Sequence, residues 1–195
     1  TLYHIFSGAD GILQCKCWKC RCERNSNYEK SVLSIDAGRK YFSEDQLKQI
    51  IDKAYKNGYT SVQILLGNDG LRFVLDDMSM QVNGKSYASE DVKKAITAGN
   101  NSYYADPNGD VLTEDEMDRI VAYAKERGLG IIPGINSPGH MDSILVAMEQ
   151  LGLENVRYTK DGKESERTVN IENPEAIEFT QVLVKKYIDY FSASG

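Results

Sequence analysis

The sequence is poor in several residue types that often carry chemistry. Its 195 residues include one Trp, two His and four Pro. A site built from several histidine ligands is excluded, because His4 and His140 are the only imidazoles of the chain. No apolar run is long enough to span a membrane, and no signal-peptide pattern opens the chain. Because the first residue is Thr1, we expect the chain to be a mature or excised piece.

Positive charge is also scarce. Lys and Arg number 23 against 29 Asp and Glu, so the formal net charge is −6. No basic stripe gathers along the chain, and a nucleic-acid partner is therefore not expected. The content of 41% hydrophobic and 27% charged residues is typical of a globular protein. The length suffices for one domain with its own core.

Cysteine is absent except in one short stretch, where four occur at Cys15, Cys17, Cys20 and Cys22. Cys17 and Cys20 have the spacing of a zinc knuckle, so a metal-thiolate protein is one alternative. A structural zinc site normally takes its second pair of ligands from farther along the chain, where this chain has no cysteine. We therefore expect no metal site and treat residues 1–30, which show no sustained periodicity, as an N-terminal arm of unknown role.

From residue 31 onward the sequence has the alternating pattern of an α/β fold. Short apolar runs predict buried strands at residues 32–35, 62–66 and 131–135. Capping boxes at residues 43–46 and 113–116 predict two helices with apolar stripes. Three such units imply a parallel sheet with right-handed crossovers. They are too few for a closed eight-stranded barrel of about 250 residues, so the alternatives are a small open sheet or a piece of a barrel.

The remaining segments predict less regular structure. A long insertion, Gly67–Asp110, contains an Asn83-Gly84 hairpin turn and a helix over Ser89–Ala98 that Ser89 caps. An insertion of this length is usually functional or forms a lid. Farther on, Asp142 is expected to cap a helix through about Leu151, and polar residues 154–168 are expected to form a loop. A last helix is expected to begin at Pro174 with Asn173 as its cap.

Two candidate binding residues follow predicted strand ends. Arg39 comes three residues after the strand-ending Asp36, and its guanidinium could bind vicinal hydroxyls of a sugar or a carboxylate. His140 follows the third strand, where it could relay a proton or orient a carboxylate. The alternatives are a surface salt bridge and a structural histidine. Because parallel α/β folds place their chemistry at the carboxyl ends of strands, we expect one pocket there.

The second strand also ends in polar residues. Asn68 and Asp69 stand between Gly67 and Gly70, directly after the second strand. We therefore expect both residues at the carboxyl end of that strand. The alternative is a plain turn. Elsewhere, adjacent acids stand mostly in the first turns of predicted helices, where they favour the helix dipole. We expect none of these acidic sets to be a catalytic pair.

Taken together, these motifs resemble glycoside hydrolase family 20, the β-N-acetylhexosaminidases. The stretches that carry the resemblance are Ser34–Phe42, Leu65–Phe73, Leu75–Met78 and Ile132–Asp142. The likeness runs from about Lys30 to Phe191, and residues 1–29 do not share it. It implies a (β/α)8 TIM barrel, of which residues 31–195 would be the N-terminal portion. This portion holds about the first three βα units, with an irregular insertion after the second strand.

The resemblance implies an enzyme that removes terminal β-linked N-acetylglucosamine from glycans with retention. In this family the substrate's own acetamido group assists. Arg39 matches the arginine that grips sugar hydroxyls, and His140 matches a histidine near the acid. Asn68 departs from members that carry two acids at this place. Which of Asn68 and Asp69, if either, completes a supporting relay with His140 therefore stays open. The family's catalytic Asp-Glu pair is expected beyond Gly195, so we expect no catalytic residue within the chain and no activity from it alone.

The resemblance also bears on partners and location. It implies a glycan with terminal β-linked N-acetylglucosamine as substrate, no cofactor, and secretion or attachment to a bacterial surface. The alternative to an enzyme is a catalytically inactive half-barrel that binds sugar weakly or serves as an assembly partner. Three parallel strands would leave unpaired edges, so we expect the isolated chain to self-associate.

Overall fold

The computed structural model describes residues 30–194, and its centre is a small parallel sheet. The sheet contains β1 (Val32–Asp36), β2 (Ser61–Asn68) and β6 (Gly130–Ile135), with β2 in the middle. A short strand, β3 (Gly70–Leu71), turns back antiparallel along the end of β2. All three strands expected from the sequence are confirmed. Their connection by helices makes this part of the chain a partial α/β barrel.

The register of the sheet brings the strand ends together. Asp36 at the end of β1 pairs with Leu65 of β2, and Ile135 at the end of β6 pairs with Gly67. The pairing of β2 with β6 shifts by one residue between Leu65 and Gly67. Because all three strands run in the same direction, the residues that follow them emerge at one edge of the sheet.

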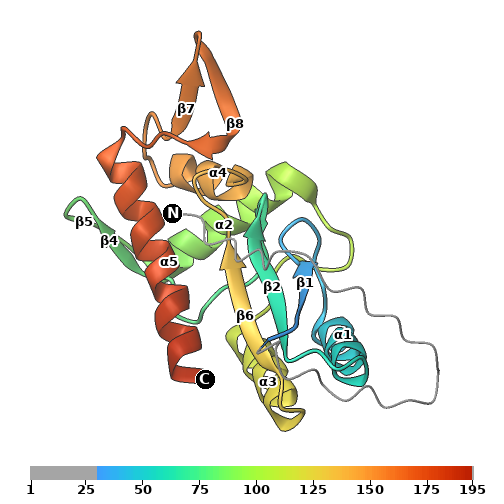
Figure 1. Cartoon of the computed structure of the whole chain (residues 1–195). Helices are drawn as coiled ribbons and strands as arrows, with labels where there is room; N and C mark the ends of the chain where they lie inside the picture. Colours follow the sequence, from blue (N-terminus) through green and yellow to red (C-terminus); the bar gives the residue numbers. More distant parts are fainter. Residues whose placement is uncertain (1–29, 195) are drawn as a thin grey trace.

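Two amphipathic helices, α1 (Glu44–Lys56) and α3 (Glu114–Glu126), lie side by side near the amino ends of the strands (Figure 1). Both expected capping boxes are confirmed, with Ser43 and Thr113 as the N-caps. The buried stripes of these helices consist of apolar side chains at helical spacing, namely Leu47, Ile51, Ala54, Met117, Ile120 and Ala124.

The insertion after β2 contains a hairpin and a long helix. Strands β4 (Met80–Val82) and β5 (Lys85–Tyr87) are joined by the expected turn, in which Asn83 and Gly84 have positive φ. Helix α2 (Ser89–Tyr104) continues past the expected end at Ala98. The expectation that Ser89 caps this helix is wrong, because Ala88 is the N-cap. The Ser89 hydroxyl instead bonds the backbone of Asp76 and Met78, which joins the start of α2 to the loop before β4.

The segment after β6 differs most from expectation. Helix α4 (Asp142–Gln150) has Met141 at its N-cap with no side-chain cap bond, so Asp142 is not the cap. Residues 154–168 are not a loop, because they contain the hairpin β7 (Arg157–Lys160) and β8 (Lys163–Val169). The turn of this hairpin is Asp161-Gly162, where both residues have positive φ. Most of the hairpin side chains are exposed, so no apolar alternation marked it in the sequence.

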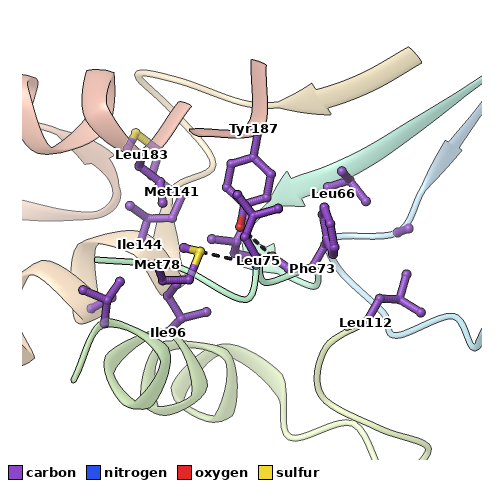
Figure 2. Close-up of a cluster of buried hydrophobic side chains, with 14 of the residues drawn as sticks. Leu66, Phe73, Leu75, Met78, Ile96, Leu112, Met141, Ile144, Leu183 and Tyr187 are labelled. Carbon is purple, nitrogen blue, oxygen red and sulfur yellow. Dashed lines mark hydrogen bonds between the residues drawn. The ribbon is translucent and has the colours of Figure 1, made fainter. Parts of the chain in front are cut away.

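The last helix, α5 (Pro174–Ser194), is capped by Asn173 as expected, since the Asn173 side chain accepts from two amides of the first turn. It closes the core of buried side chains in Figure 2. The Tyr187 ring stands edge-on to Phe73 with centroids 5.6 Å apart, and its hydroxyl donates to the Phe73 carbonyl at 2.6 Å. This contact ties α5 to the insertion, more than a hundred residues away in sequence.

Helices α2 and α4 pack on each other beyond the arrowheads of β2 and β6 (Figure 1). Gly99 permits this contact, because a Cβ atom there would collide with the backbone of Ser143. The two helices therefore cover the sheet edge at which the strand-end residues emerge. Among residues 30–194, no helix combines the length and apolar character that a bilayer crossing requires.

The contact between α1 and α3 generates a prediction about acid stability. Hydrogen bonds from Arg119 and then Lys48 lower the pKa of Glu44 from its ordinary 4.5 to about 2. The stabilisation by ionised Glu44 is therefore present above pH 4.5 and is lost as the pH falls toward 2. We expect Glu44→Gln to lower the free energy of unfolding by about 1 kcal/mol at pH 7. Urea denaturation should show this difference shrinking below pH 4.5.

Glu126→Gln is the matched control, because Glu126 is exposed and lies 3.9 Å from its nearest cation. Its effect on unfolding should be small at every pH. A Glu44→Gln deficit that persists unchanged at pH 2 would show that the ionised carboxylate is not what stabilises this contact.

Candidate functional site

The structure brings together three of the four candidate residues, because Arg39 and His140 both contact the buried carboxylate of Asp69. The Nε atom of Arg39 donates to Asp69 Oδ2 at 2.7 Å, and Nδ1 of His140 lies 2.9 Å from Asp69 Oδ1. The Asp69 side chain is only 4% exposed, whereas those of Arg39 and His140 are nearly half exposed. In this cluster of Arg39, Asp69 and His140, the guanidinium and the imidazole are therefore exposed to solvent, while the carboxylate that holds them is buried.

The backbone at Asp69 is held as firmly as its side chain. Asp69 has a φ of 63°, in the left-handed region that aspartate tolerates better than most residues. Its amide donates to the His140 carbonyl at 2.7 Å, and its carbonyl accepts from Ser143 at 2.8 Å. These two bonds fasten the loop after β6 to the end of β2. His140 therefore reaches Asp69 through both its backbone and its ring.

Asn68 lies beside this cluster but does not contact His140 through any bond in the described residues. Its Nδ2 donates to Asp36 Oδ2 at 2.7 Å, and its Oδ1 accepts from Asn136 Nδ2 at 2.7 Å. Asn68 is buried and joins the ends of β1 and β6 across β2. The question left open by the sequence is thus answered geometrically, since Asp69 is the residue that contacts the histidine.

Arg39 is positioned by close packing of its own loop. The Gly38 backbone lies against Asn68 so closely that a Cβ atom at Gly38 would collide with it. Gly38 also accepts, through its carbonyl, a bond of 3.2 Å from the buried guanidinium of Arg72. Arg72 in turn bonds Asp110 and the carbonyl of Tyr104. The insertion therefore holds the loop that carries Arg39.

The charges of the cluster explain the pKa shifts within it. Burial raises the pKa of Asp69, but hydrogen bonds with Arg39, His140 and Asp142 and the charge of Arg39 together outweigh burial, so its pKa is lowered overall. The bond to Asp69 also raises the pKa of the Arg39 guanidinium. Asp69 is therefore ionised at neutral pH, and Arg39 remains a cation beside it.

Four further residues lie around this cluster, and the sequence did not predict them as site residues. The sequence pattern marks Asp36 only as a strand end and Asp142 only as a helix cap, and it assigns no role to Asn136 or Tyr103. Asn136 directly follows the third strand, so its position in the sequence was a usable signal. Tyr103 belongs to α2 and comes near Asp69 only through the tertiary fold. Burial, and then the charge of Asp69, raise the pKa of the Tyr103 phenol.

A polar cavity of about 600 Å³ adjoins the cluster. Its walls include Tyr103 from α2, Asp142 from α4 and Arg167 from β8. Since Tyr103 and Asp142 also interact with Asp69, the cavity and the Arg39–His140 pair share one boundary. Hydroxyl, carboxyl and guanidinium groups line it, and these groups suit a polar ligand.

No metal centre is found in the part of the chain that the structure describes, where no three His, Cys, Asp or Glu side chains could hold an ion together. The alternative metal site at Cys15, Cys17, Cys20 and Cys22 lies outside the described residues, as does the arm that contains it. Within the cluster, Arg39 can donate to ligand oxygens. His140, fixed by Asp69, can accept or pass a proton.

Comparisons with known proteins agree with this geometry. Residues 31–194 match the catalytic domain of glycosyl hydrolase family 20. A solved structure from a study of the pneumococcal virulence factor StrH and its N-glycan recognition is 55% identical, with a TM-score of 0.83. Another, from work on the tandem catalytic modules of the pneumococcal exo-β-D-N-acetylglucosaminidase StrH, is also 55% identical, with a TM-score of 0.82. Each alignment covers 85% of this chain and 40% of the other.

A curated relative shows the same kinship at lower identity. Lacto-N-biosidase of Bifidobacterium bifidum is 30% identical over 122 residues, which are 63% of this chain and 9% of that protein. The chain thus spans less than half the length of these relatives. Since the family match covers nearly every residue that the structure describes, the chain belongs to glycosyl hydrolase family 20.

Proposed function

We propose that this chain forms one wall of the sugar site of a β-N-acetylhexosaminidase that removes terminal β-linked N-acetylglucosamine from glycans. The observation that carries the proposal is the meeting of Arg39, Asp69 and His140 at the carboxyl edge of the sheet. The pneumococcal relative named an exo-β-D-N-acetylglucosaminidase supports the substrate class, at 55% identity. In this proposal residues 31–195 are the N-terminal portion of the catalytic barrel, and the role of residues 1–30 stays undefined.

Arg39 is suited to bind sugar hydroxyls. Its Nε is committed to Asp69, while Nη1 and Nη2 make only long contacts of 3.5 Å, to Asp36 and His140. Those two nitrogens can donate to a ligand without losing the bond that orients the guanidinium. A fixed fork of donors matches a pair of vicinal hydroxyls, and the bonds are charge-assisted.

His140 and Asp69 are suited to support proton transfer. Nδ1 lies 2.9 Å from ionised Asp69, which can only accept a hydrogen bond, so Nδ1 donates to Asp69 and Nε2 remains for another partner. Such an imidazole can orient or exchange a proton with the acid that protonates the leaving oxygen. Asn68 serves a different purpose here, because it links Asp36 to Asn136 and fixes the strand ends.

The proposed mechanism is substrate-assisted and retaining, in which the acetamido oxygen of the sugar attacks its own anomeric carbon. The Asp-Glu pair that orients the acetamido group and protonates the leaving oxygen is proposed to lie beyond this chain. General acid catalysis contributes about 10²- to 10⁴-fold. Arg39 and His140 bind and orient but do not replace that acid. By likeness to the pneumococcal protein, we also propose secretion or attachment to a bacterial surface.

The second candidate is a non-catalytic half-barrel that binds sugar weakly or acts as an assembly partner. Within residues 30–194, β1 and β6 each pair with a neighbour on one side only. Val32, an apolar residue of the outer strand β1, is 40% exposed. Strands with one open edge can pair with a second copy, and this feature favours the candidate.

The sugar site can be tested by binding. We expect millimolar N-acetylglucosamine to shift the NMR resonances of Arg39, Asp69 and His140 in the isotope-labelled chain. Arg39→Lys keeps the charge but removes the fork of donors, so it should weaken binding about tenfold. Arg119→Lys on α3 is the control and should bind as the unmodified chain does. Equal binding by Arg39→Lys would remove Arg39 from the site.

Catalysis by the chain can be tested with an aryl β-N-acetylglucosaminide. We expect no release of chromophore above the buffer rate, because the proposed acid lies outside the chain. Preparations of the unmodified chain and of Arg39→Lys should be assayed side by side, since a contaminating enzyme would act equally in both. Turnover that Arg39→Lys abolishes would show that residues of this chain supply the acid.

Self-association can be tested by light scattering. We expect the isolated chain to exceed the monomer mass at micromolar concentration. Val32→Lys should shift it toward monomer, because a charge on an outer strand opposes edge pairing. A clean monomer of the unmodified chain would argue against open strand edges as a contact surface.

A further inference from the structure

A second carboxyl group, Asp142, lies against Asp69 and has no part in the proposed mechanism. The backbone around it is fixed on both sides of Asp142, because Asp69 bonds the His140 carbonyl and the Ser143 amide at 2.7 and 2.8 Å. The first turn of α4 is thereby held at the end of β2. This places the Asp142 side chain within hydrogen-bonding reach of the Asp69 carboxylate.

The surroundings of Asp142 are unusual for an ionised acid. Its Oδ2 is buried and has no hydrogen-bond partner among the described residues. Its Oδ1 lies 3.9 Å from Nη2 of Arg167, a side chain that is half exposed. Buried carboxylate oxygens normally accept hydrogen bonds, and an unpaired one is costly. Oδ2 of Asp142 thus has no donor among the described residues. The neighbouring acid, Asp69, is ionised.

The charge of Asp69 decides which of the two acids holds a proton. Asp69 receives bonds from Arg39 and His140, so its ionised form is favoured. Two ionised carboxylates in contact repel each other, and the pair relieves this by keeping one proton. We infer that, wherever the pair holds a single proton, Asp142 carries it and donates it in a hydrogen bond to ionised Asp69, and that Asp142 is a positioning residue for the Arg39–His140 pair.

The groups that face Asp142 from the neighbouring elements agree with this assignment. Burial is the largest cause that raises the pKa of Asp142, and contact with Asp69 raises it further, while Arg167 lowers it by less. Tyr103 from α2 is a neutral phenol, and the Arg157 guanidinium of β7 is bound to Glu149. Arg39 and His140 lie on the Asp69 side of the pair. The proton therefore stays with Asp142.

The inference has a consequence for the site. The two acids together carry one negative charge, which Arg39 and His140 share. A second charge would bind the guanidinium more tightly and hold it back from a ligand. The inference rests on the proposed function and deepens it, because it names Asp142 as the group that sets the charge next to Arg39 and His140. Its test needs no sugar, so failure of the inference can be told apart from failure of the proposed function.

The test is a carbon-13 NMR titration of the aspartate carboxyl groups in the full chain. We expect the Asp142 midpoint above the ordinary value of about 3.9 and the Asp69 midpoint below it. In Asp69→Asn, the Asp142 midpoint should fall, because the like charge is gone. Asp45→Asn, at an exposed position on α1, should leave it unchanged. A midpoint for Asp142 at or below 3.9 in the unmodified chain overturns the inference.

A second variant covers the case in which Asp69→Asn does not fold. Asp142→Asn keeps the shape and supplies an N–H donor to Asp69 in place of the O–H. The unmodified chain should lose stability relative to this variant as the pH rises above 4, since a raised pKa disfavours the ionised form. At pH 7 the urea midpoint of Asp142→Asn should equal or exceed that of the unmodified chain. A clearly lower midpoint would mean that ionised Asp142 stabilises the fold, and the inference would be wrong.

Discussion

The candidate site depends on one buried anion, the carboxylate of Asp69. It is almost fully removed from water, so it is stable only with charged or hydrogen-bonding partners close by. Arg39 arrives from the end of β1 and His140 from the end of β6, and each binds a different oxygen. One acid at the middle strand therefore holds in place two side chains that come from the strands on either side. The same acid leaves Arg39 and His140 half exposed, as a binding surface requires.

The rest of the structure keeps the strand ends at the right distance from Asp69. Asn68 connects Asp36 with Asn136, which fixes β1 and β6 on the two sides of β2. Arg72, buried in the insertion, bonds the Gly38 carbonyl next to Arg39. The insertion is in turn attached to α5 through Phe73 and Tyr187. A segment that interrupts the βα pattern thus supports the loop that carries Arg39.

The local pattern of the sequence predicted much of the fold. The capping boxes at Ser43 and Thr113 formed as expected, because their bonds run between residues three apart. The three buried strands were visible as apolar runs. The β7–β8 hairpin was missed, since its side chains are mostly exposed and carry no apolar alternation. Ser89 and Asp142 are not caps because their partners are more distant groups, which are the backbone of Asp76 and Met78 before β4 and the Asp69 carboxyl.

The sequence by itself determined the order of the three parallel strands and of the helices, the family resemblance and the places of Arg39, Asp69 and His140 after strand ends. Those features are local, and they depend on residue type and spacing along the chain. The tertiary structure alone decided that Asp69, and not Asn68, contacts His140. It also decided that Asp142 lies against Asp69. Such contacts join residues about seventy positions apart. They are set by the parallel register of the sheet and by the packing of α2 on α4, neither of which leaves a local signal.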